Sequence, residues 1–298
     1  MATLYTHQSA NVRKTWALML VFLLIVIAVG WFASEYFGSP VILWVAVAFS
    51  LVMNVSSFWF SDKIAIKAVG AKPADEREYR ELHRIVENLA ITAGLPKPRI
   101  YVIEDLAPNA FATGRNPEHA AVAVTTGLLN TLERVEIEGV LAHELSHVGN
   151  RDILVMSVAV VLVGFIAILS DMVWRISLFG GGDRDRNGNP VILIIGLAVL
   201  ILAPIAAQLM QLAVSRKREF LADASGALLT RYPEGLASAL KKIAAYDHPM
   251  KRANSATAHM FISNPFGTHG KAGKTMRKLF SSHPPMEERV SALLDMRV

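Results

Sequence analysis

Long uncharged stretches alternate with charged segments along this chain. Residues 16–33, 40–60, 153–170 and 190–214 contain no Asp, Glu, Lys or Arg. About 20 apolar residues are enough to cross the hydrocarbon core of a bilayer. One such run alone is compatible with a buried core helix, but four in one chain predict four transmembrane helices, at about 16–33, 40–60, 153–174 and 190–214.

The polar remainder consists of two segments, each small for an independent domain. They cover 61–152 and 215–298, on either side of the hydrophobic hairpin 153–214. We therefore expect one domain assembled from both segments, with 1–60 as its membrane anchor.

The first polar segment contains patterns of both regular structures. Apolar spacing predicts a helix over 73–95, and alternation predicts strands at 99–103 and 119–125, with a possible third at 109–114. A further helix is expected to begin near Thr131. The pattern as a whole indicates a mainly α membrane protein with a cytoplasmic α+β domain and a small β-sheet.

Basic residues indicate the orientation in the membrane. The first short loop, 34–39, contains no Lys or Arg, whereas the other side of the predicted spans carries nine of them, namely Arg13, Lys14, Lys63, Lys67, Lys72, Arg151, Arg216, Lys217 and Arg218. Because Lys and Arg favour the cytoplasmic side, both termini and both polar segments are expected there. The net charge of +5 is consistent with basic residues facing anionic lipid headgroups. The positive charge is not accompanied by any recognised nucleic-acid-binding module, so we expect no nucleic-acid partner.

The motif His-Glu-x-x-His occupies residues 143–147. Two histidines four positions apart lie about 40° apart around a helix, so His143 and His147 can bind one metal ion. Glu144 projects beside that ion, where its carboxylate can take a proton from an attacking water. The chain has no cysteine, which excludes thiolate ligands.

A hydrolytic zinc site usually has three protein ligands and an open position, so a third ligand is needed. Glu219, directly after the fourth run, is the best candidate, and Asp223 follows one helical turn later. An i+4 carboxylate is suited to orient a ligand histidine. The alternative is that both carboxylates only pair with the neighbouring Arg216, Lys217 and Arg218.

The stretches LAHELSHVGNRDIL, REFLADASGALL and HPPMEERVSAL resemble the HtpX membrane metallopeptidases, relatives of the CAAX prenyl endopeptidases. This resemblance covers nearly the whole chain. It implies a zincin-type peptidase of the bacterial inner membrane that binds one zinc ion through His143, His147 and Glu219. It also implies that Glu144 is the catalytic base.

Three further residues are weaker candidates. His283 opens the last predicted helix and Arg289 follows in the same motif, so either could stabilise the oxyanion, although both could be ordinary surface residues. Asn109 is a candidate for substrate binding, but an Asn in Ala-Pro-Asn-Ala is commonly a turn residue. The strand at 119–125 could pair with a substrate peptide as an edge strand, or be an ordinary strand of the sheet.

The residues predict a membrane zinc endopeptidase that acts on unfolded polypeptides. The resemblance implies that it hydrolyses misfolded or damaged membrane proteins as part of quality control and the stress response. One alternative is a prenyl-type processing peptidase, which four spans make less favoured. The other is a zinc-stabilised membrane scaffold without activity. Glu144 argues against the scaffold, because a structural metal site has no need of a carboxylate beside the ion.

Overall fold

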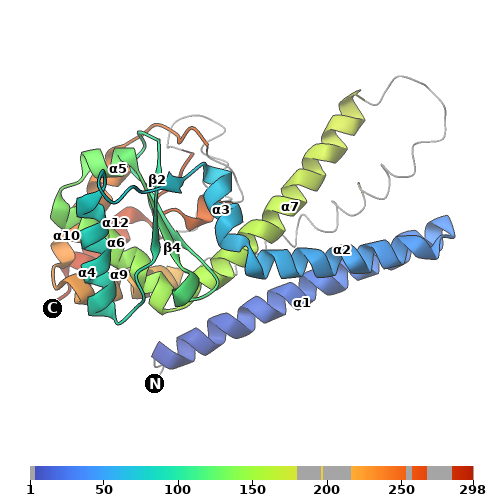
Figure 1. Ribbon diagram of the computed structural model, residues 1–298, viewed down its shortest axis with the longest axis horizontal. Helices are drawn as coiled ribbons and strands as arrows, with labels where there is room; N and C mark the ends of the chain where they lie inside the picture. The colour runs from blue at the N-terminus through green and yellow to red at the C-terminus, as the bar shows by residue number, and fades with distance from the viewer. Residues whose placement is uncertain (1–3, 180–195, 197–215, 253–256, 267–283, 298) are drawn as a thin grey trace.

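Two long apolar helices form a hairpin that projects from the rest of the chain (Figure 1). The computed structural model describes residues 4–179, 196, 216–252, 257–266 and 284–297. Helix α1 covers Leu4–Phe37 and α2 covers Pro40–Trp59. Gly38 makes the turn with a φ of 62°, and Pro40 begins α2 because its missing N–H is not needed in a first turn.

The hairpin has the surface expected of helices in lipid. Large apolar side chains such as Trp16, Leu24 and Trp44 are more than half exposed along it, the reverse of a water-soluble surface. Both helices are long and apolar enough to cross a membrane, so the first two predicted spans correspond to candidate membrane helices. At 1.5 Å per residue, α1 extends about 51 Å, which is longer than the roughly 30 Å hydrocarbon core.

Helix α7, Asp152–Phe179, begins where the third span was predicted. Its first half is buried against α1, α2 and the short helix α3, Ser61–Val69. Helix α6, Arg134–Gly149, and the start of α7 together also meet the length and hydropathy of a span, but they are bent by 85° at their junction. The described residues therefore contain two or three candidate spans, and the predicted fourth, 190–214, lies outside them apart from residue 196.

The polar segments contribute a four-stranded mixed sheet. Its strands are β1 (Lys72–Pro73), β2 (Arg99–Ile103), β3 (Ala110–Thr113) and β4 (Ala121–Thr125), in the order β1-β2-β4-β3. Strands β2 and β4 are parallel, and β3 is antiparallel to β4. All three predicted strands are present. Of the two readings of the strand at 119–125, the structure supports the ordinary sheet strand, because β4 pairs with β2 on one side and with β3 on the other.

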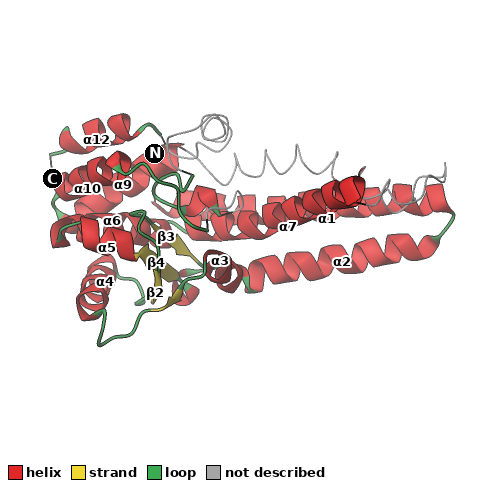
Figure 2. Ribbon diagram, turned by 90° about the horizontal axis from the view of Figure 1, so that it is seen from above, coloured by secondary structure: helices red, strands yellow, loops and turns green. Residues whose placement is uncertain are grey.

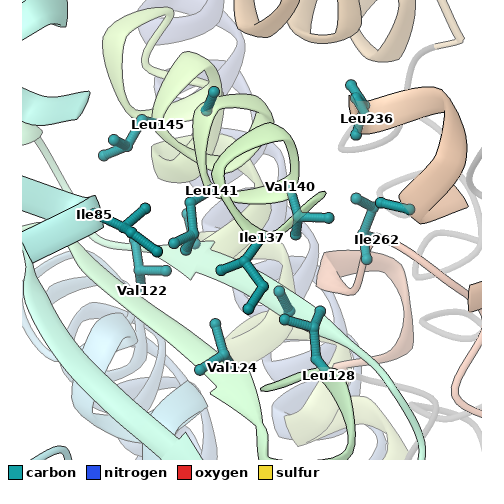
Figure 3. Close-up of a cluster of buried hydrophobic side chains, with 14 of the residues drawn as sticks. Ile85, Val122, Val124, Leu128, Ile137, Val140, Leu141, Leu145, Leu236 and Ile262 are labelled. Carbon is teal, nitrogen blue, oxygen red and sulfur yellow. The ribbon is translucent and has the colours of Figure 1, made fainter. Parts of the chain in front are cut away.

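Alternate residues of the strands supply two separate cores, as the period of a strand requires. Val122 and Val124 face a core formed with helix α4 (Arg80–Ala93) and helix α6 (Figure 3). Ala121 and Ala123 face the opposite way, into a second core that also contains Phe111 of β3 and residues at the start of α7. The sheet thus lies between α6, which carries the His-Glu-x-x-His motif, and the start of α7.

Helix α4, Arg80–Ala93, ends close to the predicted end, with Gly94 as its C-cap, but begins later than the predicted 73–95. Pro73 belongs to β1, and the Asp75 carboxylate accepts hydrogen bonds from the backbone of Arg77 and Glu78, forming a turn before the helix.

The helix that carries the metal motif begins at Arg134 rather than near Thr131, because residues 126–131 form the separate short helix α5, Thr126–Thr131. A capping box of Glu133 and Glu136 sets the start of α6. The remaining helices lie on the side of α6 away from the sheet (Figure 2). They are α9 (Arg216–Thr230), α10 (Pro233–Ala245) and α12 (Met286–Leu294), with short 3-10 turns η1 (Pro117–His119) and η2 (Ala258–Met260) elsewhere.

Candidate metal centre

The metal motif lies at the contact between α6 and α9. His143, Glu144 and His147 are all less than 5% exposed, and Glu219 on α9 is 4% exposed. The two helices approach closely because α9 carries Gly226 where it crosses α6. A side-chain carbon there would lie 2.9 Å from the backbone nitrogen of His143. This contact brings together residues that are more than 70 positions apart in the sequence.

The donor atoms of the three residues have the spacing of a zinc ligand set. The Nε2 atoms of His143 and His147 are 3.2 Å apart. The Glu219 carboxylate oxygens lie 3.7 Å from His143 Nε2 and 3.5 Å from His147 Nε2. Tetrahedral zinc with bonds of about 2.0–2.1 Å separates its ligands by roughly 3.3–3.4 Å. With one donor atom from each residue, the three donors lie within 4.8 Å of one another, so these residues fit the ligand set of a single zinc ion.

A carboxylate orients each histidine from behind. His143 Nδ1 lies 2.9 Å from an Asp223 oxygen, and His147 Nδ1 lies 3.1 Å from Asp152 Oδ2. Because a carboxylate only accepts, each Nδ1 must carry the proton, which leaves Nε2 as the ligand atom. The expectation that Asp223 orients a histidine therefore agrees with the geometry, whereas sequence reasoning did not identify Asp152.

Arg289, from α12, lies behind the ligands and is fully buried. Its Nε and Nη2 bind the two oxygens of Asp223 at 2.8 and 2.6 Å. Its Nη1 is 3.8 Å from Glu219 Oε2. The Arg289 guanidinium thus connects the candidate ligand Glu219 with Asp223, the carboxylate that orients His143.

Glu144 is buried on the sheet side of α6. Burial raises the pKa of Glu144 to about 7, and the nearby Glu219 carboxylate acts in the same direction. His147 and a hydrogen bond from the backbone of Ala112 on β3 oppose the shift. A carboxyl group with a pKa near neutrality is well matched to accept and return a proton.

The two histidines differ in charge when no metal is bound. Burial lowers the pKa of His143 to about 4, although Asp223 acts to raise it. Burial also lowers the pKa of His147, but Asp152 and Glu219 outweigh it and raise that pKa to about 9. For Asp223, burial raises the pKa, yet Arg289 and His143 hold it at about 2. A metal ion therefore has to displace a proton from His147 at neutral pH.

The weaker candidates lie in different places. Asn109 is buried at the start of β3, where its amide binds the backbone of Ser263 in both directions, at 2.9 and 3.2 Å. It therefore holds the segment around Ile262, whose N–H bonds to Ala110 on the outer edge of β3. His283 lies outside the described residues.

The metal-centre geometry agrees with three comparisons with known proteins. The model of peptidase family M48 matches residues 76–297, which include His143, Glu144, His147, Glu219 and Arg289. The chain belongs to peptidase family M48. It is a membrane-associated, zinc-dependent metallopeptidase, and the resemblance to HtpX is confirmed by its relatives.

Two of these relatives are protease HtpX homologs. The one from Caldanaerobacter subterraneus subsp. tengcongensis is 48% identical over 99% of both chains. The one from Pyrococcus furiosus is 51% identical over 84% of both chains. The crystal structure of S. mikatae Ste24p has a similar fold, with a TM-score of 0.52 and 22% identity over 97% of this chain. This M48 chain spans 65% of the length of that Ste24p chain.

Proposed function

We propose that this M48 chain is an endopeptidase whose zinc ligands are His143, His147 and Glu219 and whose general base is Glu144. The observation that carries the proposal is the cluster of three buried residues whose donor atoms, one from each, all lie within 4.8 Å of one another. Among the described residues this cluster has three members, which leaves a fourth position for water. A structural zinc site would normally fill that position, so the arrangement favours catalysis over the scaffold alternative.

Each residue has a defined part in hydrolysis. Held by His143, His147 and Glu219, a zinc ion would supply Lewis acidity toward a water molecule and the scissile carbonyl. Glu144 accepts the proton of the attacking water and returns it to the leaving amine nitrogen. Asp223 and Asp152 hold the histidine rings, and Arg289 fixes Asp223 and Glu219. Arg289 is therefore proposed as a positioning residue, while His283 remains the candidate donor for the oxyanion.

We further propose four spans, with both termini and the metal centre in the cytoplasm of a bacterial cell and the spans in its inner membrane. Two observations support this topology. Lys and Arg are absent from the loop 34–39 and abundant on the opposite side of the hairpin. Arg115 also packs over Trp59 at 4.6 Å from the ring centroid, an arrangement suited to the membrane–water interface.

The substrate strand is proposed to lie along β3, the edge strand nearest to Glu144. Ala112 of this strand already donates its N–H to the Glu144 carboxylate, so a peptide in this position would pass beside the base. Asn109 would act indirectly, by holding the Ile262 segment against the start of the strand. The proposed substrates are unfolded segments of damaged membrane proteins, because α6 joins α7 through only two residues.

The proposal is tested with the full chain purified in detergent under chelation and then reloaded with zinc. Glu144→Gln should retain zinc and lose cleavage of an unfolded protein by at least about a hundredfold, the usual loss when a general base is removed. Glu138→Gln is the matched control, since Glu138 lies on the same helix and binds only Arg134 at the surface. It should cleave like the parent.

The same assay distinguishes the alternatives. Equal cleavage by the Glu144→Gln variant would refute the assignment of the base. Zinc bound by parent and variant without cleavage by either would favour the scaffold. Equal rates on soluble unfolded proteins and on membrane-embedded ones would argue against the proposed substrate class.

A further inference from the structure

Asn11 on α1 is a buried polar residue that reaches the metal centre from the first membrane helix. It lies five positions before the uncharged run that starts at Trp16, and it is 4% exposed. Burying an amide is unfavourable unless its hydrogen bonds are made. The hydrogen bonds of the Asn11 amide therefore have to compensate for its burial.

The Asn11 amide joins three elements that meet at this end of the membrane helices. Its Nδ2 donates to Asp152 Oδ1 at 2.7 Å and to the carbonyl of Asn150 at 3.1 Å. Its Oδ1 accepts from Arg218 at 3.3 Å. Asn150 ends α6, Asp152 begins α7, and Arg218 precedes the ligand Glu219 on α9.

These contacts lead directly to a ligand histidine. Asp152 uses Oδ1 for Asn11 and Oδ2 for His147 Nδ1. Arg218 is 3.5 Å from Asp152 Oδ1, a longer contact than that made by Asn11. Among the described residues, Asn11 therefore makes the shortest contact with Asp152 Oδ1, the carboxylate oxygen that does not bind His147.

We propose that Asn11 is a positioning residue of the metal centre, and that α1 thereby belongs to the site as well as to the anchor. The inference rests on the proposed role of His147 as a zinc ligand. By fixing the Asp152 carboxylate, Asn11 keeps the His147 ring turned with Nε2 toward His143 and Glu219. The chain then binds zinc tightly only when α1 is seated against the starts of α7 and α9.

A purely structural role for Asn11 predicts something different. Leu18 and Phe22 of α1 already pack against Val155 and Leu162 of α7, so Asn11 would only strengthen an existing contact. Its loss would then lower the unfolding temperature and leave the affinity of the folded protein for zinc unchanged. The distinction therefore requires a measurement on the metal site itself.

The experiment measures zinc affinity by competition with a chelator, and the visible spectrum of the cobalt-loaded protein, on the full chain in detergent. Asn11→Ala should weaken zinc binding by about tenfold. This is the lower end of the loss of metal affinity seen when a hydrogen-bonding group outside the ligands themselves is removed. The cobalt spectrum of this variant should also differ from that of the parent. The control is Asn54→Ala, because Asn54 is a similarly buried amide on α2 whose side chain binds the backbone of Ser50 in its own helix.

A double variant tests the route through Asp152. If Asn11 acts through that carboxylate, Asn11→Ala should add little to the loss of affinity already caused by Asp152→Ala. Asn11→Ser, which keeps a donor in a smaller side chain, should recover part of the affinity and serves if the alanine variant does not fold.

Each outcome has a single meaning. Asn11→Ala with the zinc affinity and cobalt spectrum of Asn54→Ala would overturn the inference and leave the proposed function intact. Losses that add fully in the double variant would also overturn it. Failure of the parent chain to bind zinc would instead refute the proposed function.

Discussion

Gly226 offers a direct test of the idea that close approach of α9 and α6 builds the metal centre. In Gly226→Ala the new Cβ would lie 2.9 Å from the His143 nitrogen and 3.1 Å from the carbonyl carbon of Ala142. Ordinary contacts are about 3.5 Å or longer, so the helices must separate by roughly 0.5 Å. Both obstructing atoms belong to the backbone and cannot rotate away.

The expected energy follows from two opposing effects. Overpacking costs about 1–3 kcal/mol, while replacing Gly by Ala within a helix gains about 0.5–1 kcal/mol. The Gly226→Ala protein should therefore be less stable by about 1 kcal/mol. Zinc affinity should fall by about tenfold, because Glu219 moves with α9 while the two histidines stay on α6.

The assay is thermal unfolding together with chelator competition, and Gly149→Ala is the matched control. Among the described residues, a Cβ at Gly149 would come nearest to Leu95, at 3.7 Å, which is an ordinary contact, so this variant should unfold at the parent temperature or above. If Gly226→Ala matched Gly149→Ala in both stability and zinc affinity, the reasoning about helix approach would be refuted.

Two further predictions concern charge at the site. Arg289→Met should destabilise the protein by about 3–5 kcal/mol, because the buried Asp223 carboxylate loses its cationic partner and retains only its contact with His143. Arg134→Met, which removes an exposed pairing, should cost less than about 1 kcal/mol, and equal unfolding temperatures for the two would contradict this. Since burial raises the pKa of Glu144 to about 7, the base form is lost as pH falls, and kcat/KM should decline below about pH 7. A bound cation shifts this decline in kcat/KM to lower pH, because it favours the charged form of Glu144. The zinc content measured at each pH is the control. A kcat/KM that rises toward acid pH would exclude Glu144 as the base.

The sequence was sufficient to predict the residues whose spacing is local. His143 and His147 share a helix face by arithmetic alone, and Glu219 and Asp223 are one turn apart. Asp152 was missed because it follows His147 by five residues across a break in the helix. Arg151, at that break, has a φ of 56°, which turns α6 into α7 and brings Asp152 back to His147.

Other features depended on pairing between distant segments. The alternation of Val122 and Val124 identified a strand but contained nothing about its neighbours, so the central position of β4 could not be predicted. Likewise, Asn11 is an unremarkable polar residue before an apolar run, and only the packing of α1 against α7 gives it contacts with the site.

The 85° bend between α6 and α7 has a geometric consequence for cleavage. With α7 crossing the bilayer as proposed, α6 runs close to the plane of the membrane, so His143, Glu144 and His147 share nearly one height above the lipid. The distance between the membrane surface and the cleaved peptide bond would then be nearly constant. Cut sites in membrane substrates would fall within a narrow band, counted in residues from the end of the substrate's own span, whatever the local sequence.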